Sequence, residues 1–479
     1  MSSNGKFDRH EDEKLIHELA RWDDHAAAVA RTKEITSRRV ELTGCGLNLT
    51  EAHLTGLDLR EFDLRHCTLN RADLHSTNLS SANLKGASLV CPGMERTNLT
   101  NANLSGTYFH ALAAQNSYFN GADFSDAVDG TGTLFHGCSM RNIRASNTVL
   151  AGATFYQCDL HGADLRNSNL QGATINECVV EQTDFSGALV SHLTFTKCRM
   201  RNTRFDGATG RGLTLHSPTC SDSLQLSGAD LPMLCCDQVM GAGMEGVKLN
   251  APGADFQSCS LNDVNFSEAN LARSRWLECT VEAGTFSSAK LDGAFFSHCR
   301  LPQLAFDHVR AENIHFVESQ LARADMRGFA ARCAFFRDCN LEHADLTGAY
   351  LYRSMLTGDP PRAMSLRGAK LNNAVLTQSY IAADLEGASL RGAIAAYARL
   401  NQCSLQNADL SGVNAFEASM VKVDVTGATL IGLGPPIFVS RCPGLSESLS
   451  EIDDHSSREL GLFVEGMENL RNGGRKGST

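Results

Sequence analysis

The cysteines are the residues of this chain whose spacing most suggests chemistry. They recur every 20 residues in two series, Cys138, Cys158, Cys178, Cys198 and Cys259, Cys279, Cys299, Cys339, with Ser319 at the missing step. Thiols stacked on neighbouring strands could hold a soft metal ion or form disulfides. The sequence has no CxxC pair and no zinc-like cluster, however. We therefore interpret the thiols as small core residues and predict no metal site.

A histidine beside a cysteine is a second candidate arrangement, because such a pair can carry nucleophilic catalysis. His298 directly precedes Cys299. Adjacent residues on a strand point to opposite sides, so His298 should face outward and Cys299 inward. The same argument makes His161, His192 and His343 surface histidines. None of them is expected to be catalytic.

An enzyme would need an active site in the irregular stretch 207–253 or in a terminal segment. The candidates in that stretch are His216, Cys235 and Cys236. No set of nucleophile, base and oxyanion donors stands out anywhere in the chain. We predict a protein without catalytic, cofactor-binding or metal-binding residues, and with no cofactor.

The elements that position these side chains follow from a period of five. Large apolar residues stand at Leu49, Leu54, Leu59, Leu64 and onward to Phe109, and, after a weak position at Ala114, at Phe119, Phe124 and Leu134. Neither a helix nor a flat strand has this period. A chain that turns a corner at every repeat does, and four such sides close a square coil.

Two longer periods agree with this coil. The thiols repeat every 20 residues, and aromatic residues repeat every ten, at Phe256, Phe266, Trp276, Phe286, Phe296, Phe306 and Phe316. The first period is one full coil of four sides, and the second is half a coil. Two opposite sides should therefore carry aromatic residues inward, and the other two should carry leucine-like residues.

The frame of five shifts by one residue between Leu134 and Leu150 and again between Leu215 and Leu226. It steps back between Ile381 and Leu385. Two stretches blur the repeat, 126–147 and 207–253, and are candidate bulges, kinks or binding loops. The irregularity at Asp359-Pro360-Pro361 stays in frame.

The repeat resembles that of the pentapeptide-repeat family, whose motif is a small residue, Asp or Asn, Leu or Phe, a polar residue and a Gly-like residue. Clear matches are Ala163-Asp164-Leu165-Arg166, Ala229-Asp230-Leu231 and Ala344-Asp345-Leu346-Thr347-Gly348. The resemblance covers residues 44–430. It implies an all-β fold, a right-handed quadrilateral parallel β-helix of about 19 coils. The family is functionally diverse, so the resemblance says little about the partner.

The predicted domains are an N-terminal helical cap over 1–40, the β-helix over 41–432, and a C-terminal helix with a disordered tail over 433–479. An apolar stripe at helical spacing marks each end, for example Leu15, Leu19 and Trp22, and Phe463 and Met467. The C-terminal helix could cap the coil or form a homodimer.

Charge and termini limit the partners and the compartment. The formal net charge is −11, which gives no basic footprint for direct nucleic-acid binding and no attraction to an anionic membrane. The N-terminus lacks a secretory signal, and no apolar run is long enough to span a membrane. We expect a cytoplasmic protein, although export by a non-classical route is compatible with its polar start.

These observations favour a non-enzymatic scaffold that binds one or more protein partners. Within that class we favour an adaptor or accessory of a bacterial secretion system, such as a type VI effector loader. One alternative is a DNA mimic that protects gyrase or topoisomerase IV, as some family members do. The mixed charges over 41–430 weaken that alternative. A host-directed secreted effector is the other.

Overall fold

The computed structural model describes residues 46–220, 223–358, 364–434, 436 and 438–445. Both predicted helical caps and the C-terminal tail lie outside the described residues. The described residues form an all-β parallel solenoid, which confirms the predicted fold class. The chain divides into two compact units, Met1–Ala242 and Gly243–Thr479.

Each side of the coil follows from three consecutive residues of the repeat. In Ala72-Asp73-Leu74, Ala72 and Leu74 are fully buried, whereas Asp73 points outward. Side chains alternate along a strand, so the small residue and the large residue share the inward face. The Leu74 N–H donates to the Gly93 carbonyl of the next coil (2.9 Å), and the Asp73 N–H donates to the Ala52 carbonyl of the previous one (2.9 Å).

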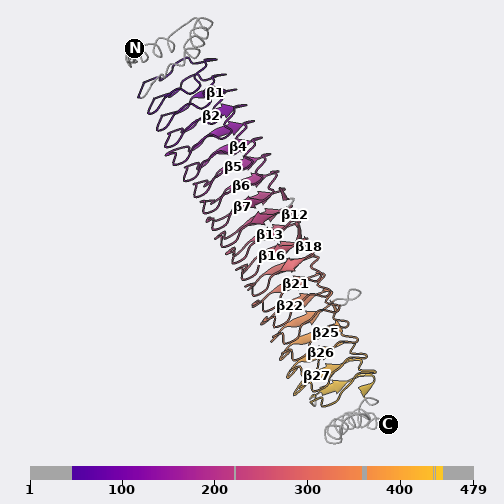
Figure 1. Cartoon of the computed structure of the whole chain (residues 1–479). Helices are drawn as coiled ribbons and strands as arrows, with labels where there is room; N and C mark the ends of the chain where they lie inside the picture. Colours follow the sequence, from indigo (N-terminus) through magenta and orange to yellow (C-terminus); the bar gives the residue numbers. More distant parts are fainter. Residues whose placement is uncertain (1–45, 221–222, 359–363, 435, 437, 446–479) are drawn as a thin grey trace, which may run out of the picture. The chain divides into compact units, whose positions relative to one another are not determined.

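In the first unit one side forms the longest ladder, in which strands pair parallel and in register from coil to coil. Its strands are β1 (Gly93–Glu95), β2 (Ala113–Gln115), β3 (Leu134–His136), β4 (Thr154–Tyr156), β5 (Thr174–Asn176), β6 (Thr194–Thr196), β8 (Thr214–His216) and β11 (Cys235–Asp237). Two further sides contain β7 (Thr203–Arg204) with β10 (Leu224–Gln225), and β9 (Thr219–Cys220) with β12 (Met240–Ala242). Figure 1 shows these strands following one another coil by coil.

The second unit repeats this arrangement (Figure 1). Its longest ladder contains β14 (Asp255–Gln257), β17 (Arg275–Leu277), β20 (Phe295–Ser297), β21 (His315–Val317), β22 (Phe335–Arg337), β23 (Met355–Thr357), β25 (Tyr380–Asp384), β26 (Arg399–Asn401), β27 (Ser419–Val421) and β28 (Phe438–Ser440). Shorter ladders contain β13 (Met244–Glu245), β16 (Val264–Asn265) and β19 (Gly284–Thr285), then β15 (Ser260–Asn262) with β18 (Thr280–Val281), and β24 (Met364–Ser365) beside β25.

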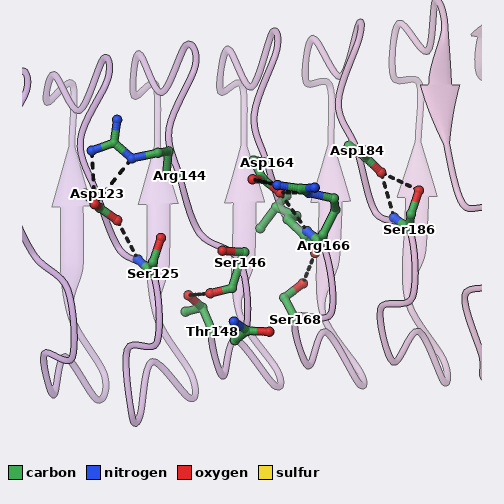
Figure 2. A network of polar contacts seen from close by, with 12 residues as sticks. Asp123, Ser125, Arg144, Ser146, Thr148, Asp164, Arg166, Ser168, Asp184 and Ser186 are labelled. Atoms are coloured by element: carbon green, nitrogen blue, oxygen red, sulfur yellow. Dashed lines mark hydrogen bonds and ion pairs between the residues drawn. The ribbon is translucent and has the colours of Figure 1, made fainter.

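The corners explain why the motif places Asp or Asn in the middle of each side. The Asp123 carboxylate accepts the N–H of Ser125 (3.0 Å), and the Asp184 carboxylate accepts that of Ser186 (2.9 Å). This bond to the residue two positions on is an Asx turn, which starts the bend. Figure 2 shows both contacts on their separate coils. The bend is then completed by a residue with positive φ, such as Asp126 (φ 57°).

The core of the second unit contains two stacks of aromatic rings. Along one side the rings of Trp276, Phe296 and Phe316 lie nearly parallel, with centroids 5.6 and 4.8 Å apart. Along the opposite side Phe286 and Phe306 stack at 5.1 Å. Rings of the two stacks meet edge to face, as Trp276 and Phe286 do at 5.6 Å and 77°. The prediction from the ten-residue period is therefore confirmed.

The structure corrects the first frame shift. Leu134 was expected inside, but its side chain is 44% exposed, and Phe135 fills the core instead. The shift occurs earlier, where Val128 is the extra residue and is 48% exposed. Accordingly, Gly106 N–H donates to Ser125 O, whereas Ala111 N–H, one side later, donates to Thr131 O and so reaches one position further along the chain. One residue bulging outward resets the frame without disturbing the core.

The other frame changes lie where the sequence indicates. Met200 N–H donates to Thr219 O, whereas Phe205 N–H donates to Gln225 O, so the second bond again spans one residue more. The backward step falls in β25, which runs through five residues without a corner. Asn340 pairs with Ser365, so this coil is longer than the regular coils by one five-residue repeat. Because the extra length is a whole repeat, the inward and outward positions keep their order. The described residues of 126–147 and 207–253 contribute strands and bridges to the coil, as their neighbours do. Among these residues there is therefore no extended binding loop.

Candidate binding surface

The structure places the thiols of the 20-residue series inside the coil. Cys158 donates its thiol hydrogen to the Phe135 carbonyl (3.3 Å), and the Cys178 sulfur accepts the Cys158 N–H (3.2 Å). Burial raises the pKa of the Cys339 thiol to about 12, which keeps it protonated and unreactive. Within the described ranges the cysteines form no disulfide, and no group of three His, Cys, Asp or Glu side chains could hold a metal ion.

His298 and Cys299 face opposite ways, as predicted, but the physical reason differs. His298 is a corner residue with φ 54°, and its Nε2 lies 3.5 Å from Glu318 Oε2. Cys299 is buried and donates to the Trp276 carbonyl (3.2 Å). His192 and His343 are likewise exposed corner residues, with φ near 56°. His161 is only half-buried, with its Nδ1 3.7 Å from Glu181 Oε2.

The three candidates for an enzyme do not converge on one point. Cys236 is fully buried in the core, while Cys235 is half-buried and lies in register with Thr214 of β8 on the previous coil. His216 Nδ1 contacts Asp237 Oδ2 at 2.7 Å, a partner that sequence reasoning did not single out. Because Cys236 faces the interior, it cannot act together with this surface pair.

Over much of the outer surface, acidic and basic side chains are paired. Asp123 binds Arg144 of the next coil (3.0 Å), and Asp164 binds Arg166 of the same coil (2.7 Å), as Figure 2 shows. The hydrogen bond from Arg166 lowers the pKa of the Asp164 carboxyl. On each side of the coil the outward Asp and Asn residues of successive coils line up in a row. The arginines that pair with them interrupt these rows, so the rows do not form a continuous acidic face.

Asp164→Asn should separate the two contributions of Asp164 to stability, which are the hydrogen bond of the turn and the ion pair with Arg166. Asparagine keeps the oxygen that accepts the Arg166 N–H (3.2 Å) but loses the ion pair. A carboxyl with a lowered pKa stabilises the fold above its ordinary value of 3.8, and this contribution disappears as the pH falls below it. The variant should therefore unfold at a lower temperature than the parent at neutral pH. Thermal unfolding followed from neutral to acidic pH should show the two midpoints converging. A gap that persists in acid would contradict the ion-pair origin.

One corner of the second unit departs from the paired surface because its outward side chains are large and apolar. We call this group the aromatic corner, and it consists of Tyr350, Tyr352, Met355, Val375, Tyr380, Ile394, Tyr397 and Phe416. Five of them, Tyr350, Met355, Ile394, Tyr397 and Phe416, are 42–49% exposed. Apolar side chains gathered in this way on a protein surface mark a binding site more often than scattered ones do.

Two adjacent sides of the coil supply the flanks of the aromatic corner. On one side Tyr350, Val375 and Ile394 are in-register bridge partners on successive coils. On the next side Met355 of β23 pairs with Tyr380 of β25. Since successive coils are joined by backbone hydrogen bonds, these side chains are held at fixed spacing before any partner arrives.

The bend between the two sides carries the remaining rings. Tyr352 stacks against Tyr350 with centroids 6.1 Å apart, and Tyr397 meets Phe416 edge to face at 5.8 Å. Tyr397 is itself a corner residue with φ 59°, a conformation that costs energy for a bulky residue. The ring is thereby directed away from the core.

An open groove of about 660 Å³ lies within the aromatic corner. Its walls include Met355, Gln378, Tyr380, Tyr397, Arg399 and Glu417. The volume falls in the range of sites that hold small molecules or peptide side chains. Ser379, Ala398 and Ser419 complete the lining, which is therefore mixed, with apolar and polar side chains side by side.

Comparison of the sequence with models of known protein families identifies the repeat. The model described as a pentapeptide repeat region matches residues 149–222, and the model of eight pentapeptide repeats matches 48–86, 94–128, 250–275, 319–358, 383–420 and 396–432. Together they cover more than half of the chain. The chain belongs to the pentapeptide-repeat family. No curated protein sequence matches this pentapeptide-repeat protein.

Solved structures of other pentapeptide-repeat proteins are similar to this one in fold. Trypsin-treated QnrB1, a plasmid-mediated fluoroquinolone resistance protein, is 19% identical, over 45% of this chain and 89% of that one, with a TM-score of 0.21. HetL of the cyanobacterium Nostoc, involved in heterocyst differentiation regulation, is 20% identical over 57% and 90%, with a TM-score of 0.16. A protein of the Arabidopsis thaliana thylakoid lumen is 24% identical over 29% and 66%, with a TM-score of 0.14.

The family motif also explains how the aromatic corner arises. Tyr350, Met355, Val375, Tyr380 and Ile394 all occupy the outward middle position that the motif gives to Asp or Asn. Sequence reasoning about this pentapeptide-repeat protein concentrated on inward positions and missed them. Counting large apolar residues at the outward position would have found the aromatic corner.

Proposed function

We propose that this pentapeptide-repeat protein is a non-enzymatic scaffold that binds a protein partner through the aromatic corner. The supporting observation is the cluster of five exposed large apolar side chains on neighbouring coils of the second unit. Tyr, Phe, Met and Arg are enriched where proteins bind one another, and aromatic anchors supply much of the affinity. The rigid backbone of the coil lowers the conformational cost of binding.

The finer role we propose is that of an adaptor for a bacterial secretion system. The aromatic corner occupies only one bend of the second unit, so the other sides are available for a second partner. An adaptor needs two such surfaces, and a repeat protein provides many equivalent positions. In the part of the chain that the structure describes, no helix is long and apolar enough to cross a bilayer.

The DNA-mimic alternative needs an extended run of unpaired negative charge. Here the acidic rows are interrupted by arginines, as in Asp123–Arg144 and Asp164–Arg166. We therefore rank protection of gyrase or topoisomerase IV below the adaptor role. A secreted effector would use the same surface on a host protein.

The test compares partner capture by full-length variants. A tagged chain is used to recover partners from the native lysate, and the partner recovered is then purified and its affinity measured. Tyr397→Asp should weaken binding by roughly 30-fold, as expected for a hot-spot anchor. The matched control is Tyr118→Asp, since Tyr118 is 52% exposed but lies in the first unit, outside the aromatic corner. Equal affinities of the two variants would refute the proposal.

The identity of the purified partner then separates the finer roles. A spike component or toxin whose binding depends on Tyr397 would establish the adaptor role. Gyrase or topoisomerase IV subunits would replace it with the topoisomerase role. A host protein would favour the effector role.

A further inference from the structure

Three arginines at the aromatic corner differ from most of the arginines elsewhere on the surface. Arg332, Arg353 and Arg399, which we call the rim arginines, have no carboxylate within ion-pair distance among the described residues. Some arginines of the same unit are paired with carboxylates, for example Arg327 with Asp325 (2.5 Å) and Arg367 with Asp384 (3.0 Å). The rim arginines share the absence of such a pair with other described arginines of the unit, but they are the ones that lie beside the exposed apolar side chains of the aromatic corner. The rim arginines are exposed and concentrate positive charge on a chain whose net charge is −11.

Two of the rim arginines are held in place by the tyrosine between them. The guanidinium carbons of Arg332 and Arg353 lie 5.5 and 5.1 Å from the centre of the Tyr352 ring. Arg353 Nε and the Tyr352 hydroxyl both donate to Gln378 Oε1, at 2.6 and 2.9 Å. These contacts orient the charged groups without neutralising them, because neither a ring nor an amide carries negative charge.

The third rim arginine lies in the groove. Arg399 lines it together with Tyr380 and Tyr397 and follows Tyr380 in register on the next coil. Two carboxylates lie in the same region, Glu312 on the coil before Arg332 and Glu417 in the lining of the groove. The three rim arginines outnumber them, so the charge of this group of residues is net positive.

We infer that the aromatic corner recognises a segment of a partner protein in which acidic side chains stand among large apolar ones. This inference rests on the proposed function and names the chemistry of the partner. A carboxylate can accept two parallel hydrogen bonds from one guanidinium, and such pairs add both strength and geometric selectivity. The apolar side chains of the segment would pack on Tyr350, Ile394 and Tyr397.

A single-stranded nucleic acid is the competing ligand, since arginines and aromatic rings also bind bases and phosphates. One observation favours the peptide. Met355, Val375 and Ile394 offer no flat surface on which a base could stack, whereas the apolar side chains of a peptide can pack on them. An oligonucleotide is therefore included in the test as a rival probe.

The experiment measures fluorescence anisotropy of labelled probes with the full chain. The first probe is a peptide in which Glu and Asp alternate with Phe and Leu. The second replaces the acidic residues by Lys, the third replaces the apolar residues by Ser, and the fourth is oligo-thymidine. We expect the first probe to bind best and to be weakened by salt. Failure of the first probe to bind, or tighter binding of the Lys peptide or of oligo-thymidine, would overturn the inference.

Variants separate this inference from the proposed function. Combined Arg332→Gln, Arg353→Gln and Arg399→Gln should weaken the first probe and the purified partner by at least roughly tenfold. Arg327→Gln is the matched control, because Arg327 is exposed in the same unit but paired with Asp325. If binding of the partner requires Tyr397 but is unchanged by the triple variant, the proposed function stands and this inference fails. Unchanged thermal unfolding of the triple variant excludes loss of fold as the cause.

Discussion

Replacement of Phe296 by Asp is expected to lower the free energy of unfolding of the second unit by more than about 4 kcal/mol, the cost of removing a buried Phe side chain. Phe296 is fully buried, with its ring stacked between Trp276 (5.6 Å) and Phe316 (4.8 Å). The substitution removes both contacts and introduces a carboxylate without a partner. Burial of an unpaired charge adds to the loss, and the group either takes up a proton or draws water into the core.

The neighbouring residue provides the control for this prediction. Phe295 points outward and is half-buried on the same strand, β20. Phe295→Asp should change the unfolding midpoint far less, because its carboxylate stays in water. Both variants are compared by chemical and thermal denaturation. Similar losses for the two substitutions would show that the inward and outward positions are not those described.

Cys299→Leu is expected to destabilise the second unit by about 1–3 kcal/mol through overpacking. Cys299 occupies the small inward position, where its thiol donates to the Trp276 carbonyl at 3.2 Å. Leucine at this position would extend toward the rings stacked along the axis. It would also leave that carbonyl without its sulfur donor.

The ladder itself supplies the control for Cys299. Ser319 occupies the equivalent position on the next coil, and its Oγ accepts the Cys299 N–H at 3.2 Å. Cys299→Ser should therefore be tolerated, with a smaller shift in the unfolding midpoint than Cys299→Leu. If the serine variant were as unstable as the leucine variant, the thiol would have a role beyond its size, such as metal binding.

The inward half of this structure could be predicted from the sequence because the physics of a narrow core is repetitive. The interior of every coil has the same dimensions, so the same kinds of inward residue recur. Large apolar residues recur on each side, aromatic residues with each half coil and cysteines with each full coil. The exception at Leu134 is instructive. Leu134-Phe135 offers two apolar residues in succession, and only the position of the Val128 bulge decides which one turns inward.

The outward half was harder to predict because no common environment imposes a pattern on it. The aromatic corner combines residues that lie far apart in sequence, from Tyr350 to Phe416. Their proximity can be predicted only if the number of residues in each coil is known. One coil has an extra repeat before Ser365, and another lacks a corner in β25. The rim arginines are recognised by their position beside these apolar side chains, which requires coordinates.

The bridge from Asn340 to Ser365 passes over a whole extra repeat, yet the inward residues of both coils stay aligned. A change in length by a whole number of repeats therefore leaves the core intact. Genes that encode such a repeat can gain or lose segments by unequal recombination and still encode a folded protein. Over evolutionary time the outer surface can then be rearranged in steps of one side of the coil, which would bring distant side chains such as those of the aromatic corner together without a new fold.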